Sequence, residues 1–180
     1  MMGKTRKQTG FTIVELLIVI AVIAILAAIT VVAYSGIQAR ARDSQRQADV
    51  RMITKALELY YIDNGRYPAG SGSTVINGSW STTADASWPN LAMVLKPYLS
   101  QLSADPISTA GTNVQTPVGY NYAYFSNSGG VYCGAAPYQM YILVYRFEAL
   151  TQINDLNGTC VVTPLLYGGG AASNYRMSKL

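Results

Sequence analysis

The sequence predicts an α+β fold, in which a long N-terminal helix packs by its second half on a small antiparallel sheet. Three observations carry this prediction. The nineteen residues from Leu16 to Tyr34 contain no charged side chain. The proline-free stretch from Ser35 to Asp63 repeats apolar side chains every three or four positions, as a helix with one buried face does. Two later segments, 120–125 and 138–147, alternate in the manner of strands.

The uncharged run is long enough to cross a lipid bilayer. At ~1.5 Å per residue it measures ~28 Å, which is about one hydrocarbon thickness. Lys4, Arg6 and Lys7 precede it, and the positive-inside rule keeps such an end in the cytoplasm. The rest of the chain is then predicted to lie outside. A cleaved secretory signal would place its small residues after the apolar core, whereas here Gly10 comes before it.

The second half of the predicted helix carries one apolar stripe and many charges. The stripe comprises Val50, Ile53, Leu57, Tyr60 and Tyr61. The charged residues are interpreted as a solvated face, with the alternative that some of them match charges on neighbouring copies. They are Arg40, Arg42, Asp43, Arg46, Asp49, Arg51 and Lys55. The helix is predicted to run from about Phe11 to Asp63 and to stop at the Asn-Gly pair that follows.

The remaining residues, 64–180, are predicted to form a globular head. Residues 69–88 are rich in Gly, Ser and Thr and are interpreted as an exposed loop. A short helix is predicted over Pro89–Leu95, with proline in its first turn. Segment 138–147 has two apolar faces and is expected to be a central strand of three or four. Residues 160–163 are expected to return as a strand, and the tail from Gly168 onward to be loose.

A single acid, Glu15, stands at the start of the apolar segment. A carboxylate in hydrocarbon costs several kcal/mol unless it is paired or protonated. Cleavage after Gly10 would expose the amine of Phe11, four residues before Glu15 and on the same helix face. The amine could pair with Glu15 of its own chain or of a neighbouring copy. The alternative is an acid at the membrane edge, hydrated among the headgroups, and the residues alone leave the two interpretations open.

The stretch KQTGFTIVELLIVIAVIAIL resembles the N-terminus of type IV prepilins and pseudopilins. The match rests on a basic leader ending in Gly10, then Phe11, then Glu15 as the fifth residue after the junction. The segment LELYYIDNGRYP, Leu57–Pro68, extends the resemblance at the correct distance. The resemblance implies that a prepilin peptidase cleaves after Gly10 and methylates the Phe11 amine. It also implies that Glu15 supports assembly by pairing with a neighbour's N-terminus.

The chain departs from the family pattern at two positions of the apolar helix. The family usually has a glycine and a proline where this chain has Ala24 and Val32. Local melting of the helix on assembly is a family feature that depends on those residues. Gly36 is the remaining weak point, and a glycine costs only ~1 kcal/mol in a helix. A continuous helix is therefore predicted.

The resemblance implies a structural subunit of a type IV pilus and not an enzyme. The leader would be residues 1–10, the transmembrane and assembly helix 11–34, and its continuation into the head 35–63. The precursor would cross the inner membrane once, and the mature chain would polymerise into an extracellular filament for adhesion, motility or DNA uptake. Implied partners are further copies, the prepilin peptidase, the assembly platform with its motor ATPase, and minor pilins. The alternatives are a pseudopilin of a type II secretion or competence system and a monomeric membrane-anchored binding or enzymatic domain.

Composition argues against several other classes of function. The formal net charge of +4 comes largely from the leader, so a nucleic-acid-binding surface is not indicated. The chain has no histidine and no motif for a cofactor or a metal. Asn154, Asp155 and Asn157 could offer oxygen ligands to calcium, but the series is short and is interpreted as a turn. Cys133 and Cys160 are expected to form a disulfide if the head is exported.

Overall fold

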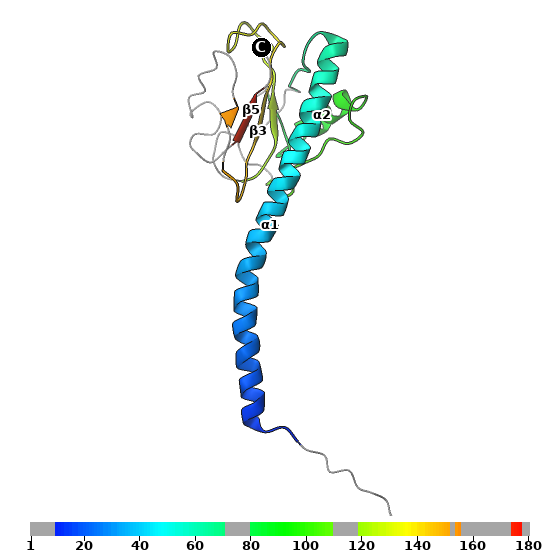
Figure 1. Cartoon of the computed structure of the whole chain (residues 1–180). Coiled ribbons are helices and arrows are strands. Elements are labelled where there is room, and N and C mark those ends of the chain that lie inside the picture. The colour runs from blue at the N-terminus through cyan, green and yellow to red at the C-terminus, as the bar shows by residue number, and fades with distance from the viewer. Residues whose placement is uncertain (1–9, 71–79, 110–118, 152–153, 156–173, 178–180) are drawn as a thin grey trace, which may run out of the picture. The chain divides into compact units, whose positions relative to one another are not determined.

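The computed structural model describes residues 10–70, 80–109, 119–151, 154–155 and 174–177 (Figure 1). The chain divides into two compact units, Met1–Ala39 and Arg40–Leu180. The first helix, α1 (Ile13–Asn64), contributes its first half to one unit and its second half to the other. The long N-terminal helix predicted from the sequence is therefore confirmed, with bounds that differ from the prediction by two residues at its start and one at its end.

Both ends of α1 have clear local causes. Thr12 precedes the helix, and its side chain accepts a hydrogen bond from the Glu15 N–H at 3.2 Å. At the other end, the Gly65 N–H donates to the Tyr61 carbonyl at 2.8 Å, and Gly65 has φ of 67°. This is the left-handed cap that glycine supplies at low conformational cost. The Asn-Gly stop predicted from the sequence is the stop observed.

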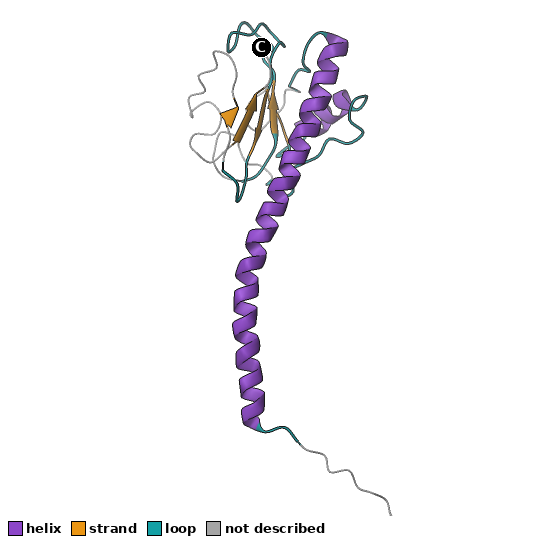
Figure 2. Cartoon of the chain, viewed as in Figure 1, coloured by secondary structure: helices purple, strands orange, loops and turns teal. Residues whose placement is uncertain are grey.

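In the part of the head that the structure describes, the strands form one mixed sheet of five, with strand order β1-β2-β3-β5-β4; Figure 2 shows the strands in orange. Its strands are β1 (Trp80–Thr82), β2 (Ala123–Phe125), β3 (Ile142–Tyr145), β4 (Asn154–Asp155) and β5 (Asn174–Met177). The pairs β1–β2, β2–β3 and β3–β5 are antiparallel, whereas β4–β5 is parallel. The antiparallel sheet of the prediction is confirmed at its centre, and the parallel edge pair was not predicted.

Three strands, β1, β4 and β5, lie where the sequence predicted none. β1 falls within residues 69–88, which were interpreted as an exposed loop, yet Trp80, Ser81 and Thr82 are all buried. Its three residues pair with Ala123–Phe125, so a partner distant in sequence fixes a segment with little strand signal of its own. β5 falls in the tail predicted to be loose and pairs with β3. The strand expected at residues 160–163 lies outside the described residues.

Strand β3 is the central strand that its two apolar faces predicted. One face places Leu143 and Tyr145 in the main hydrophobic core, together with Tyr141 just before the strand. The other face places Ile142 and Val144 in a second cluster, which also contains Met140, Trp80, Ala123 and Ala135. Because adjacent strand residues point to opposite faces, both sets are buried only if both sides of the sheet are covered.

The two helices cover the same face of the sheet. The main core joins Val50, Ile53 and Leu57 of α1 to Leu91 and Leu95 of α2 (Ser87–Leu95). α2 begins two residues before Pro89, where the prediction began it, and so places the proline in its first turn. The three α1 side chains belong to the predicted stripe, which therefore fixes the second half of α1 on the sheet.

Candidate assembly site and the Arg46 cluster

Glu15 lies in the first turn of α1 and forms a capping box with Thr12. Its Oε2 accepts hydrogen bonds from the Thr12 N–H and from the Thr12 hydroxyl, both at 2.8 Å. The Thr12 hydroxyl in turn accepts from the Glu15 N–H. Such a reciprocal pair satisfies two of the amide groups that a helix start leaves without partners. Thr12 was missed by the sequence reasoning, although Thr-x-x-Glu is the pattern that marks a capping box.

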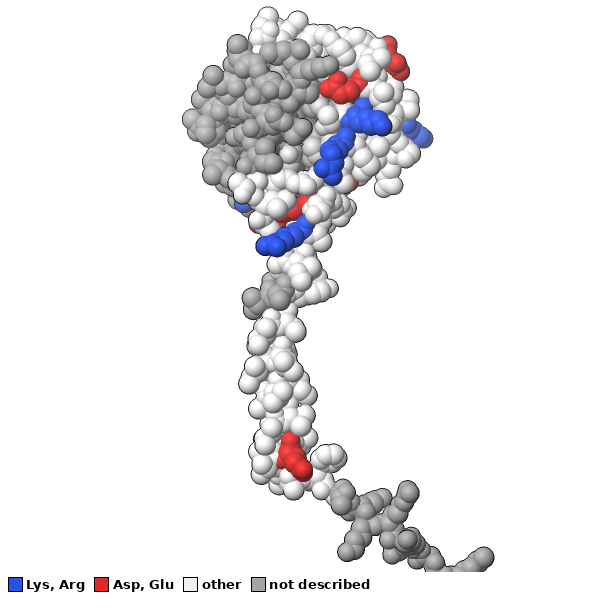
Figure 3. Space-filling model, in the orientation of Figure 1, with Lys and Arg blue, Asp and Glu red and all other residues white. Residues whose placement is uncertain are grey.

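The rest of this unit presents an apolar surface. Ile13–Thr30 is the one stretch of the described residues that is long and apolar enough to cross a membrane, and none of it is buried within the chain. The surface of this segment is white apart from a single red patch near its start (Figure 3). Phe11 is 92% exposed just before the helix. An apolar surface of this extent requires lipid or other protein chains around it.

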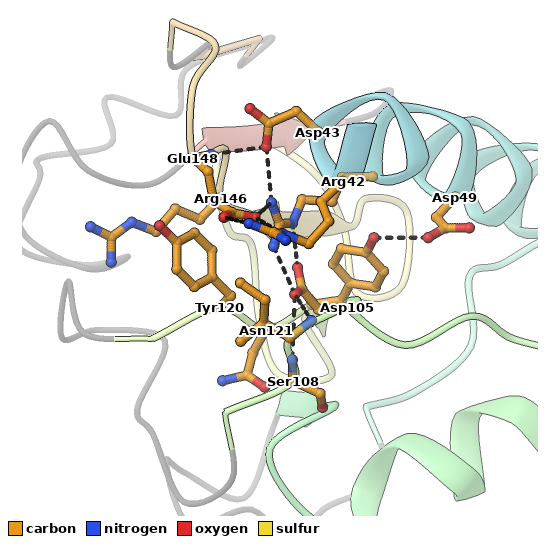
Figure 4. Close-up of polar contacts among 12 residues, drawn as sticks. Arg42, Asp43, Asp49, Asp105, Ser108, Tyr120, Asn121, Arg146 and Glu148 are labelled. Carbon is orange, nitrogen blue, oxygen red and sulfur yellow. Dashed lines mark hydrogen bonds and ion pairs between the residues drawn. The ribbon is translucent and has the colours of Figure 1, made fainter. Parts of the chain in front are cut away.

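In the head, five charged residues form a compact group that we call the Arg46 cluster. Its members are Arg42, Asp43, Arg46, Asp105 and Glu148. Figure 4 labels all of them except Arg46. The Arg46 guanidinium donates to both carboxylate oxygens of Asp105, at 2.7 and 3.0 Å. Its Nη1 also donates to Asp43 at 2.9 Å and to Glu148 at 2.6 Å. Arg46 is fully buried, and its planar donor group suits this geometry better than a lysine ammonium would.

The carboxylates of the cluster also hold the backbone of two distant segments. Asp43 accepts hydrogen bonds from the N–H groups of Glu148, Ala149 and Leu150 at 2.8–2.9 Å. Asp105 accepts from the Ile107 N–H at 2.9 Å. The cluster therefore ties α1 to the segment after β3 and to the segment after α2.

The buried charges correct one interpretation of the sequence. The charged side chains of residues 40–55 were expected to form a solvated face, but Asp43, Arg46 and Asp49 are buried. Asp49 accepts a hydrogen bond from the Tyr122 hydroxyl at 3.0 Å. Arg42 is partly buried against Glu148, whereas Arg40, Arg51 and Lys55 are exposed as expected. Partners more than fifty residues away in sequence decide which charges are buried, so helical spacing gave no signal.

Acid should weaken the Arg46 cluster. Burial alone would raise the pKa of Asp43, but three backbone N–H groups and Arg46 outweigh it, and the pKa lies below its usual value. The hydrogen bond from Arg42 is the largest contact that lowers the pKa of Glu148. A carboxyl whose pKa is lower in the folded chain than in the unfolded chain stabilises the fold at any pH above its unfolded pKa. This contribution is lost as the pH falls through the pKa of the folded chain. In the unfolded chain the pKa values of Asp and Glu are about 4.

We therefore expect the free energy of unfolding to be constant from about pH 7 to about pH 5 and to fall below about pH 4. Denaturant unfolding of the full chain in detergent, followed by tyrosine and tryptophan fluorescence, measures this dependence. The Glu148→Gln variant should show a shallower decline, because one of the responsible carboxyls is absent. Equal stability of the wild-type chain at about pH 7 and about pH 3 would contradict the assignment.

Comparison with known proteins gives the family of this chain. A family described as the prokaryotic N-terminal methylation motif matches residues 5–31. A second family, described as type II secretion system protein G, matches residues 33–128. The chain belongs to this family. The resemblance to type IV pilins and pseudopilins that the sequence predicted is confirmed, and both matches place the chain among type IV pilin-like proteins.

Three relatives of this pilin-like chain show how the similarity is distributed. It is 37% identical to the type II secretion system core protein G of Vibrio cholerae over 67 residues, which are 37% of this chain and 46% of the relative. It is 40% identical to the type IV wide pilus major component PilA4 of Thermus thermophilus over 73 residues, 41% of this chain and 56% of the relative. It is 38% identical to a fimbrial protein of Neisseria meningitidis over 72 residues, which are 40% of this chain and 42% of the relative.

This pilin-like chain therefore spans about half the length of the curated relatives that it matches. Pilus and secretion-system relatives appear at similar identity, so the pilin interpretation is no better supported than the pseudopilin alternative. No solved structure matches the chain. The family is one of structural proteins, and what its members assemble with is transferred to this chain only as a proposal.

The remaining predicted site residues stay predictions. Gly10 and Phe11 lie next to each other before α1, where a peptidase would need them. Cys133 lies in the described head, but Cys160 lies outside the described residues, so the predicted disulfide is untested. Asn154 and Asp155 form β4 and not the expected turn, and Asn157 lies outside the described residues.

Proposed function

We propose that this chain is a structural subunit of a type IV pilus. The precursor crosses the inner membrane once, with its head outside, and is cleaved after Gly10 by a prepilin peptidase that methylates Phe11. The mature chain polymerises through its apolar helix into an extracellular filament that serves adhesion, motility or DNA uptake. Its partners are further copies, minor pilins, and an assembly platform with a motor ATPase. It carries no catalytic activity of its own.

The observation that carries this proposal is the fully exposed apolar segment Ile13–Thr30, with one acid in its first turn. Lipid covers such a surface in the precursor, and neighbouring helices cover it in a filament. Little hydrophobic free energy is gained by moving from one to the other, because the segment is already out of water in both. The favourable contribution must therefore come from specific contacts, of which a pair between Glu15 and a neighbour's Phe11 amine is the first.

A second candidate function is a pseudopilin of a type II secretion or competence system. It is favoured by the match of residues 33–128 to the protein G family and by the similarity to core protein G of Vibrio cholerae. Both functions require the same cleavage and the same helix packing. They differ in whether the filament leaves the cell surface as a long fibre.

Mass spectrometry of the mature N-terminus in filaments sheared from the cell surface tests the proposal. We expect a chain that begins at methylated Phe11 in the sheared fraction. The same N-terminus found only in the cell envelope, with protein secretion lost on deletion of the chain, would assign the pseudopilin function. A working chain that still carries Met1 and the leader would overturn both and support a monomeric membrane-anchored domain.

A further inference from the structure

The exposed charges of residues 40–55 on α1 are all basic, because the two acids of this stretch are buried. In sequence, residues 40–55 mix basic and acidic side chains. In the head, Asp43 and Asp49 are buried, whereas Arg51 and Lys55 remain exposed. The buried acids are already engaged, Asp43 with Arg46 and Asp49 with Tyr122. This part of the helix therefore has a basic surface.

A groove of about 370 Å³ lies on this basic surface, between α1 and the end of β3. It is lined by Gln47, Val50, Arg51, Thr54, Lys55, Tyr145 and Phe147. No acidic side chain lines it, and Arg51 and Lys55 form no ion pair with any residue that the structure describes. Two cations one helical turn apart beside an apolar floor are complementary to a carboxylate presented by another surface.

The same helix carries an exposed acid close to its C-terminal end. Asp63 is exposed, and its carboxylate accepts a hydrogen bond from the Tyr98 hydroxyl at 2.9 Å. Asp63 lies eight residues after Lys55. At ~1.5 Å and ~100° per residue, the two side chains are separated by ~12 Å along the axis and ~80° around it. The basic and acidic surfaces of one chain therefore face different directions.

We propose that the groove at Arg51 and Lys55 receives the Asp63 end of a second, parallel copy of this chain, displaced along the helix axis by ~12 Å. Because the two surfaces differ, the contact is heterologous, and each copy offers an exposed groove and an exposed acid to the next. Such a contact propagates into a filament and does not close into a dimer. The inference rests on the proposed function, since it names the head contact of the filament that the apolar helices build.

Charge exchange in cells tests this contact. Lys55→Glu and Asp63→Lys should each reduce filament mass in the sheared or envelope fraction by about fivefold or more, because each places like charges together. The double variant Lys55→Glu with Asp63→Lys restores the opposite signs and should recover at least about half of the wild-type mass. Arg51→Glu should repeat the loss. Lys96→Glu is the matched control, because Lys96 is an exposed cation outside the groove, and it should leave filaments unchanged.

The outcomes separate this inference from the proposed function. Membrane levels of every variant are compared first, so that a variant that fails to fold is recognised, and the recovery in the double variant excludes a folding defect. Wild-type filaments with no loss in either single variant would overturn the head contact and leave the filament function intact. A double variant as defective as the singles would also overturn it. Absence of wild-type filaments would refute the proposed function itself.

Discussion

Arg46→Ala is expected to lower the free energy of unfolding of the head by about 3–5 kcal/mol, because it leaves buried carboxylates without their cation. The substitution removes four hydrogen bonds, to Asp43, Asp105 and Glu148. The side chains of Asp43 and Asp105 are fully buried, so water cannot replace the lost donors. Since domains of this size are stable by only about 5–15 kcal/mol, the loss is a large share of the total.

The measurement is denaturant unfolding of the full chain in detergent at neutral pH. Arg51→Ala is the control, because Arg51 is exposed on the same helix, and its effect should stay within about 0.5 kcal/mol. Arg46→Lys should recover little of the loss, since an ammonium cannot bond both oxygens of Asp105 and reach the other two carboxylates as well. An Arg46→Ala chain as stable as the Arg51→Ala chain would show that the cluster does not stabilise the head.

The parts of the fold that the sequence predicted are those with a periodic apolar signal. The stripe at Val50, Ile53 and Leu57 repeats at helical spacing, and the two faces of β3 alternate, so local residues alone define both elements. β1 and β5 are short strands whose pairing partners lie far away in sequence. β1 forms because it pairs with β2, and β5 forms because it pairs with β3. The strand propensity of the local residues carries no information about such distant pairing.

The Arg46 cluster is the feature that sequence reasoning could not find. Asp43 and Arg46 share one helix, but Asp105 and Glu148 come from two loops of the head. A charged residue on a helix is ordinarily solvated, and only the tertiary fold brings the four together. By contrast, Gly10, Phe11 and Glu15 could be predicted as site residues because the roles expected of them depend on order along the chain. Thr12, within the same motif, would have followed from its spacing to Glu15.

Glu15→Ala is expected to leave the precursor in the membrane and to reduce filaments at least about tenfold. The apolar helix does not need the acid in order to insert, since removing a carboxylate from hydrocarbon is favourable. Filament assembly, unlike membrane insertion, is expected to need the acid, because without it a methylated amine at Phe11 would have no anionic partner among the packed helices. An uncompensated charge there costs several kcal/mol, and each 1.4 kcal/mol corresponds to about tenfold in an equilibrium.

The capping box makes this experiment sharper, because different variants separate the observed cap of Glu15 from its proposed role in assembly. Glu15→Gln keeps an acceptor for the Thr12 N–H and removes the negative charge, whereas Thr12→Ala removes the hydroxyl of the cap and keeps the charge. If pairing with a neighbour's amine drives assembly, Glu15→Gln loses filaments as Glu15→Ala does, and Thr12→Ala retains most of them. Electron microscopy of sheared filaments, normalised to membrane levels, gives the result. Normal filaments from Glu15→Gln would show that the acid serves the helix start and not the contact between subunits.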